Sequence, residues 1–96
     1  MKDVLKNLDK AFENRTRLGI MAGLVVNDYL DFNALKELLG VTDGNLASHL
    51  KTLEKAKYIT YKKEFLERKP NTNYAATAKG ISAFKKHIHA IEQLLN

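Results

Sequence analysis

Two short helical segments joined by a sharp turn span residues 34–58, and they constrain the fold more than any other part of the chain. Gly40 stands where the first helix should stop, because glycine readily takes the left-handed conformation that ends helices. Thr42 is then placed to cap the second helix, in which leucines recur at the spacing of one buried stripe: Leu46, Leu50 and Leu53. A short helix, a glycine-containing turn and a second helix form the helix-turn-helix pattern.

The other face of this second helix is polar. Its outward side chains are Thr42, Asp43, Asn45, Ser48, His49, Lys51 and Thr52. Asparagine can pair with adenine through two hydrogen bonds, serine and threonine suit bases or phosphates, and lysine suits phosphate or guanine. Asp43 fits less well, because phosphates repel a carboxylate unless it caps the helix or accepts from a cytosine amino group. We interpret the face as a DNA-reading surface; the alternative is an ordinary solvated helix face.

The segments before this pair predict two more helices and a small strand. Apolar residues share one face over residues 3–12, which indicates a short amphipathic helix. Asn14 is a plausible cap for a helix over residues 15–26, and residues 29–32 can form an edge strand. Asn33 is predicted to cap the helix over residues 34–39.

After Lys57 the pattern changes to strand formers at residues 58–61 and, more weakly, at 74–76. The polar stretch between them, KKEFLERKPNTN, reads as the long tip of a hairpin, called a wing. Thr77 then caps a last helix over residues 78–95. The order is α-α-(β)-α-α-β-β-α, that of a winged helix, a mainly α fold with a small β-hairpin (α+β).

The wing carries more positive than negative charge. Its basic residues are Lys62, Lys63, Arg68 and Lys69, set against Glu64 and Glu67. An arginine or lysine at the tip can enter a minor groove, where narrow A·T-rich tracts attract positive charge. The alternative is a solvated turn. Arg15 and Arg17 open the second helix and could contact a phosphate or form surface salt bridges with Glu13 or Asp9.

The last helix has an apolar seam with alternating spacings of three and four residues, the pattern of helix pairing. Its members are Ile81, Phe84, Ile88, Ile91 and Leu95, and Val4 and Leu8 lie on the apolar face of the first helix. Packing within one chain explains part of the seam. We predict that residues 1–96 form one domain whose terminal helices (about 3–13 and 78–95) build a two-fold dimer, which would place two recognition helices about 34 Å apart, one turn of DNA.

Composition narrows the class of protein. The net charge of +5 moderately favours an anionic partner, and the absence of cysteine excludes disulfides, zinc–thiolate sites and thiol redox sensing. No apolar run is long enough to span a bilayer and no signal peptide is evident, so we expect a cytoplasmic protein with no membrane partner. His89 and Glu92 have metal-ligand spacing but are too few for a site, so we expect no metal and no cofactor. No catalytic constellation is present, which argues against an enzyme.

With these residues identified, the chain resembles the small winged-helix transcriptional regulators of the MarR/ArsR type, in their compact branch of about 100 residues. The resemblance rests on NRTRLGIM (14–21), on DFNALKELLGVTDGNLASHLKTLEKAKYI (31–59) and on RKPNTNYAATAKG (68–80). It implies a homodimer with base contacts from Thr42, Asn45, Ser48, His49 and Thr52, and with phosphate or minor-groove contacts from the basic wing residues. The family's glycine after the recognition helix is Lys57 here, so the hairpin must be entered without glycine.

These observations predict a sequence-specific, dimeric DNA-binding regulator, acting as a repressor by covering an inverted-repeat operator. A protein-interaction winged helix and a non-specific chromosome-binding protein are the alternatives. No residue set demands a small-molecule effector.

Overall fold

The computed structural model describes residues 1–96. Its elements follow the predicted order: α1 (Lys2–Leu5), the 3₁₀ turn η1 (Lys10–Phe12), α2 (Arg15–Val26), β1 (Leu30–Asp31), α3 (Phe32–Leu39), α4 (Asp43–Lys55), β2 (Ile59–Leu66), β3 (Lys69–Ala76) and α5 (Ala78–Leu94). The predicted winged-helix architecture is therefore confirmed.

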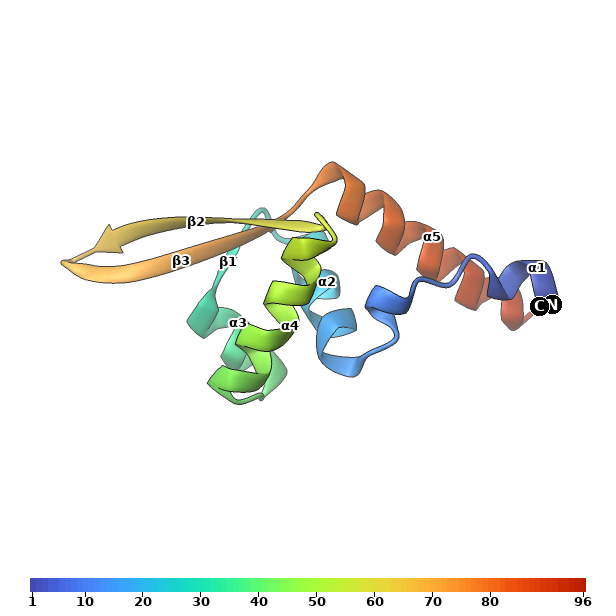
Figure 1. The fold of residues 1–96 in the computed structure, drawn as a ribbon, viewed down its shortest axis with the longest axis horizontal. Coiled ribbons are helices and arrows are strands. Elements are labelled where there is room, and N and C mark those ends of the chain that lie inside the picture. Colours follow the sequence, from blue (N-terminus) through green and yellow to red (C-terminus); the bar gives the residue numbers. More distant parts are fainter.

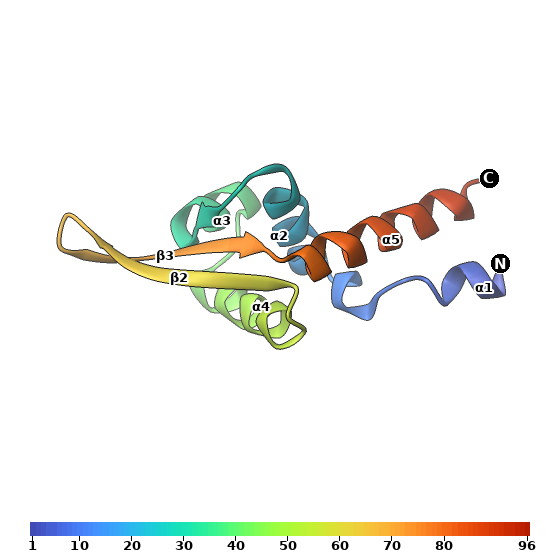
Figure 2. The ribbon, with the colours of Figure 1, turned by 90° about the horizontal axis from the view of Figure 1, so that it is seen from above.

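The molecule is elongated, with principal extents of 52 × 25 × 21 Å. Helices α2, α3 and α4 form a central group, from which the β2–β3 hairpin extends in one direction and α5 in the other (Figure 1). The two chain ends lie together at the far end of α5, where α1 runs beside it (Figure 2). None of the helices combines the length and apolar character needed to cross a membrane.

The sheet is antiparallel, with strand order β1-β3-β2. Strands β2 and β3 pair without interruption from Ile59↔Ala76 to Leu66↔Lys69, so the expected long, irregular tip is wrong. Only Glu67 and Arg68 form the turn, both at positive φ (51° and 70°). A ribbon solvated on both faces shows no alternation of apolar and polar residues, and this is why its outer half reads as a loop.

Side-chain caps set the starts of the helices. Asn14, Thr42 and Thr77 cap α2, α4 and α5 as predicted, each accepting a hydrogen bond from a backbone N–H three residues on. Gly40 ends α3 at φ +64°, also as predicted. The predicted cap of α3 is wrong: Asp31, not Asn33, accepts from the Ala34 N–H at 2.8 Å. Strand β1 leads directly into the helix, so the helix begins two residues earlier.

The N-terminal arm departs from the expected continuous helix over residues 3–13. Helix α1 ends at Leu5, and the chain is extended at Asp9 before η1 begins. The Asp9 side chain caps η1 by accepting from the Ala11 N–H at 2.9 Å. Phe12 thereby turns inward and is only 2% exposed. The amphipathic pattern identified inward residues but missed the break, because aspartate competes with the helix by capping a new turn.

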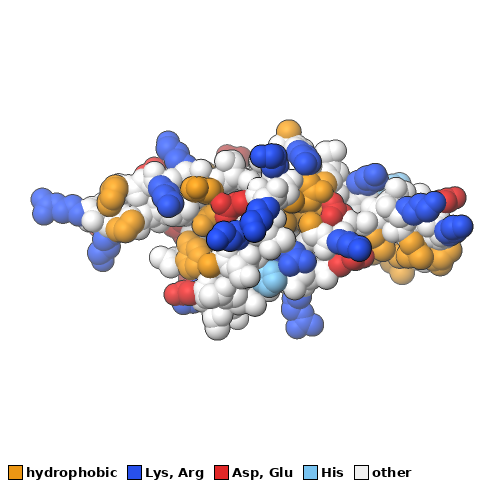
Figure 3. All heavy atoms as spheres, viewed as in Figure 1, with side chains coloured by type: hydrophobic (Ala, Val, Ile, Leu, Met, Phe, Trp, Pro, Cys, Tyr) orange, Lys and Arg blue, Asp and Glu red, His pale blue; other side chains and the backbone are white.

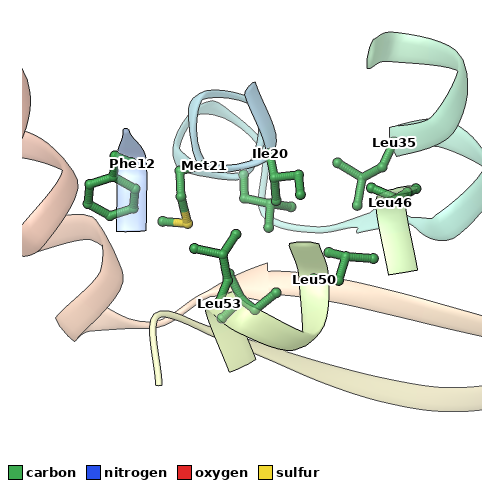
Figure 4. Close-up of a cluster of buried hydrophobic side chains, with 9 residues drawn as sticks. Phe12, Ile20, Met21, Leu35, Leu46, Leu50 and Leu53 are labelled. Carbon is green, nitrogen blue, oxygen red and sulfur yellow. The ribbon is translucent and has the colours of Figure 1, made fainter. Parts of the chain in front are cut away.

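The core lies between α2 and the leucine face of α4 (Figure 4). Its nine buried members are Phe12, Ile20, Met21, Leu24, Leu35, Leu46, Leu50, Leu53 and Ile59. All three leucines of the α4 stripe are at most 1% exposed, which confirms the predicted buried face. Burying each such side chain stabilises the fold by about 1.5–3 kcal/mol, so this face is committed to the core. The opposite face of α4 is left for solvent or a partner.

Candidate nucleic-acid interface

Helix α4 presents the predicted polar face to solvent. Its exposed members are Thr42, Asp43, Asn45, Ser48, Lys51 and Thr52, while His49 is half-buried. These side chains come from a helix whose other face is held by the core, so their positions are set by rigid packing rather than by a loop. The structure thus brings the predicted reading residues together on one accessible surface.

Asn45 is held in place by a neighbouring helix. Its Oδ1 accepts a hydrogen bond from the Thr16 hydroxyl at 3.1 Å, at the start of α2. A carbonyl oxygen has two acceptor sites, so Oδ1 can still accept from an adenine amino group while Nδ2 donates. Thr16 therefore fixes the direction of the amide, a positioning contact that the sequence did not reveal.

His49 is oriented by Arg17. The Arg17 Nη1 lies 3.0 Å from His49 Nδ1, and its Nε donates to the Ala11 carbonyl at 2.7 Å. Guanidinium can only donate, so Nδ1 is the acceptor and the proton of the neutral ring sits on Nε2. Burial, and second the Arg17 charge, hold the pKa of His49 below its usual value. Arg17 thus ties η1 to α4, and the salt bridge considered for it with Glu13 or Asp9 is absent.

Asp43 and Gly44, at the start of α4, have different surroundings from the side chains described above. Asp43 pairs with Lys36 of α3 at 2.8 Å, which partly compensates the carboxylate near the reading face. A Cβ added at Gly44 would have no atom within 4 Å, so no neighbouring helix requires glycine there. The surface at Gly44 is open.

The wing supplies exposed cations. Lys62, Lys63, Arg68 and Lys69 are all exposed, and no carboxylate lies within 4 Å of any of them or of Arg15. Glu64 instead accepts from the Asn73 amide at 2.6 Å. In Figure 3, basic side chains lie along the wing and across the middle of this face, with a few acidic side chains between them. This face therefore combines donors for bases with unpaired positive charge.

The base of the wing is locked to α5. Lys57, in the position of the expected glycine, adopts φ +64°. Its carbonyl accepts from the Thr77 hydroxyl at 2.7 Å, and the Tyr58 carbonyl accepts from the Thr77 N–H at 3.0 Å. Gly80 lies so close that an added Cβ would be 2.0 Å from the Tyr58 oxygen. Helix α4, the wing and α5 therefore meet in one rigid joint.

A polar cluster beneath this joint was missed by the sequence reasoning. The Tyr58 hydroxyl donates to the Asp9 carboxylate at 2.5 Å, and the Asp9 N–H donates to Nδ1 of buried His87 at 2.9 Å. The hydrogen bond to Asp9, together with burial, raises the pKa of Tyr58 to about 12. These residues are far apart in sequence and form no motif, so no pattern could have found them.

The residues predicted for dimerisation fall into two groups. Val4, Leu8, Ile81, Phe84 and Ile88 are half-buried within the chain, and Phe84 packs edge-on against the Phe12 ring at 5.4 Å between centroids. Ile91 and Leu95, by contrast, are 37% and 83% exposed, as is Leu5 at 49%. Part of the apolar seam is thus packed within the chain, and its far end stays exposed. His89 and Glu92 belong to no group of three or more side chains that could hold a metal ion.

Comparison with known proteins matches residues 16–95 to the model of the winged helix DNA-binding domain family. The chain is 42% identical over 85 residues to an uncharacterized protein, MJ0432, of Methanocaldococcus jannaschii, covering 88% of this chain and 92% of the relative.

Solved structures of other proteins share this fold. A transcriptional regulator homologue from Pyrococcus horikoshii superimposes with a TM-score of 0.86 at 28% identity, covering 98% of this chain and 91% of that one. MepR of S. aureus, solved as a DNA complex, superimposes at 0.72 with 19% identity, covering 99% and 81%, and so shares the fold. The resemblance to small winged-helix regulators is confirmed, and both family and fold are those of a DNA-binding protein rather than an enzyme. The chain belongs to the family of winged-helix DNA-binding domains.

Proposed function

We propose that this protein is a sequence-specific transcriptional regulator that binds double-stranded DNA as a homodimer and represses by covering a promoter. The observation that carries the proposal is the polar face of α4, held rigid by its buried leucines and flanked by wing cations that have no carboxylate partner. A surface that served only solvation would not need oriented amide and imidazole groups beside unpaired charge.

The two parts of the surface have different tasks in this proposal. Lys62, Lys63, Arg68 and Lys69, together with Arg15, neutralise phosphates and supply most of the affinity. The side chains of α4 enter the major groove and supply discrimination, with Asn45 suited to adenine and Lys51 to guanine or phosphate. His49 offers its Nε2–H as a donor, because Arg17 occupies Nδ1.

The dimer is proposed from the far end of α5. Helix α1 is a single turn, too short to cover the apolar side chains at the far end of α5. Ile91 and Leu95 of the C-terminal segment and Leu5 of α1 are therefore exposed at the end of the molecule remote from the wing. A second copy related by a two-fold axis would cover this apolar surface. The same axis would place two copies of α4 to read half-sites about 34 Å apart on one side of the duplex.

The test is a selection from random DNA duplexes at near-physiological salt, followed by sequencing. Enrichment of an inverted repeat with half-sites one turn apart supports the proposal. Binding without enrichment would instead indicate a chromosome-coating protein, and no binding would favour a protein partner. Repression is then tested by placing the enriched duplex over a promoter and measuring transcription with purified polymerase.

Two variants separate the tasks of helix and wing. Asn45→Ala should reduce discrimination at one base position by about 1–3 kcal/mol. Arg68→Ala should weaken binding to all duplexes and lower the salt slope by about one. Identical effects of both variants on every duplex would refute this division.

The dimer has its own test by sedimentation equilibrium. Leu95→Asp should shift the protein toward monomer, since it puts charge into the proposed apolar interface. Val26→Asp is the matched control, because Val26 is 79% exposed and lies on α2, away from the chain ends. Equal oligomeric states for the two variants would exclude this interface.

A further inference from the structure

The outer half of the wing exposes large apolar side chains. Phe65 is 76% exposed and Leu66 52% exposed, and Pro70 is exposed directly across from Phe65. Phe65 and Pro70 share one face of the ribbon because residues opposite each other in an antiparallel pair point to the same side. Nothing in the chain covers them. Phe65 and Leu66 lie outside the hydrophobic core, and apolar surface exposed at the end of a projecting hairpin favours a binding role.

The surroundings of these side chains identify the partner's chemistry. Lys63 lies on the same face of the ribbon as the apolar pair, Arg68 lies in the turn and Lys69 lies on the opposite face. None of the three has a carboxylate partner. Figure 3 shows basic and apolar side chains side by side at the outer end of the wing. A partner must therefore offer closely spaced negative charge on either side of a flat apolar surface. DNA has this combination, since phosphates flank stacked bases.

The hairpin is stiff enough to hold the apolar side chains at its tip in a fixed position. Eight consecutive residue pairs join β2 and β3, and the turn consists of two residues, both in the left-handed conformation without glycine. A non-glycine residue reaches that conformation at a cost of about 1–2 kcal/mol and has few alternatives near it. The ladder thus holds Phe65 at a fixed place near the tip.

We propose that the wing tip is a wedge: Phe65, backed by Pro70, inserts between two base pairs from the minor groove and bends the duplex. This inference rests on the proposed DNA-binding function and deepens it. The dimensions support it. Two paired strands lie about 4.8 Å apart before side chains are added, whereas the minor groove of B-DNA is about 6 Å wide. The tip can enter only if the groove opens, and unstacking one step opens the groove and bends the duplex toward the major groove.

Leu66 is the less suitable wedge. It lies on the opposite face of the ribbon from Phe65, paired with Lys69, and is less exposed. We expect Leu66 to lie against the deoxyriboses that line the minor groove. Pyrimidine–purine steps such as TA unstack most easily, so the wedge should favour a TA or CA step outside the major-groove half-site.

The experiment measures bending and unstacking separately from binding. The probe is a duplex of about 30 base pairs carrying the sequence enriched by selection, or a mixed-sequence duplex with TA steps if none is enriched. Fluorophores at its two ends report bending by energy transfer, and 2-aminopurine beside each flexible step reports unstacking. Wild type should bend the duplex by roughly 20–90° and raise the 2-aminopurine signal at one step.

Variants assign the effect to the wedge. Phe65→Ala should abolish the 2-aminopurine signal and most of the bend while still binding, and Phe65→Trp should retain both. Val26→Ala is the matched control, an equally exposed apolar side chain on α2. Circular dichroism checks that each variant is folded.

The outcomes are distinct. Binding by wild type without bend or unstacking overturns the wedge and leaves the proposed function standing, whereas failure to bind any duplex overturns the proposed function. Phe65-dependent binding to anionic phospholipid vesicles, or Phe65-dependent self-association, combined with unbent DNA, would assign the apolar tip to a membrane or to a second copy.

Discussion

Gly80→Ala tests the joint between the wing and α5. The added Cβ would lie 2.0 Å from the Tyr58 carbonyl oxygen, against about 3.4 Å for an ordinary contact, so the start of α5 must move by about 1.4 Å. The obstacle is backbone, which cannot rotate away as a side-chain end would. The same movement stretches the Thr77 N–H···Tyr58 O bond from 3.0 Å to beyond hydrogen-bonding distance and disturbs the 2.7 Å bond from the Thr77 hydroxyl to Lys57.

The magnitude follows from these contacts. Two lost hydrogen bonds cost about 2 kcal/mol, and disturbed packing under the first turn of α5 costs about 1–2 kcal/mol. Replacing glycine by alanine in a helix returns up to about 1 kcal/mol. We expect a net destabilisation of about 2–3 kcal/mol, which lowers Tm by roughly 10–20 °C for a domain of this size.

The assay is thermal and urea unfolding at one fixed protein concentration, since the stability of the proposed dimer would depend on concentration. Gly44→Ala is the matched control, because the same change in α4 meets no atom within 4 Å and should stabilise the protein by up to about 1 kcal/mol. If Gly80→Ala were neutral or stabilising like Gly44→Ala, the close packing of α5 on Tyr58 would be refuted.

Three further predictions concern single contacts. Because the pKa of Tyr58 is raised to about 12, its contribution is fully present below pH 10 and is lost as the pH rises from about 10 to about 12; Tyr58→Phe should lose this alkaline dependence in unfolding measurements, and an unchanged pH profile would contradict the Asp9 hydrogen bond. Arg17→Gln should raise the pKa of His49 without restoring it fully, because burial is the larger cause; an NMR titration that shows no rise would argue against the contact. Lys57→Gly should stabilise the fold by about 1 kcal/mol, since glycine adopts φ +64° without strain; urea midpoints check this, and a loss of stability would show that Lys57 makes a compensating contact.

The local patterns in the sequence predicted most of the architecture. The leucine stripe of α4, the caps Asn14, Thr42 and Thr77, and the turn at Gly40 are each decided by neighbours within one or two helical turns, and all are confirmed. The errors occur where two local solutions compete. Both Asp31 and Asn33 can cap a helix, and the strand leading into α3 decides between them.

The site was predictable in composition but not in its connections. The exposure of the α4 polar face could be predicted because the leucines on the opposite face had to be buried. The excess of cations in the wing is visible in the sequence itself. The contacts Thr16–Asn45, Arg17–His49 and Asp9–Tyr58 join residues 29, 32 and 49 positions apart. Such contacts depend on how helices cross, which no spacing within one element specifies.

The joint at Tyr58 also gives α5 the mechanics of a lever. Seventeen helical residues reach about 25 Å from the point where Thr77 and Gly80 are fastened. A rotation of about 10° at that point would move the far end of the helix by about 4 Å over this length. In a two-fold assembly joined at the far ends, the same rotation would swing both recognition helices relative to each other. Small changes where Tyr58 contacts Thr77 and Gly80 would therefore be magnified into the distance between the half-sites that such a pair could span.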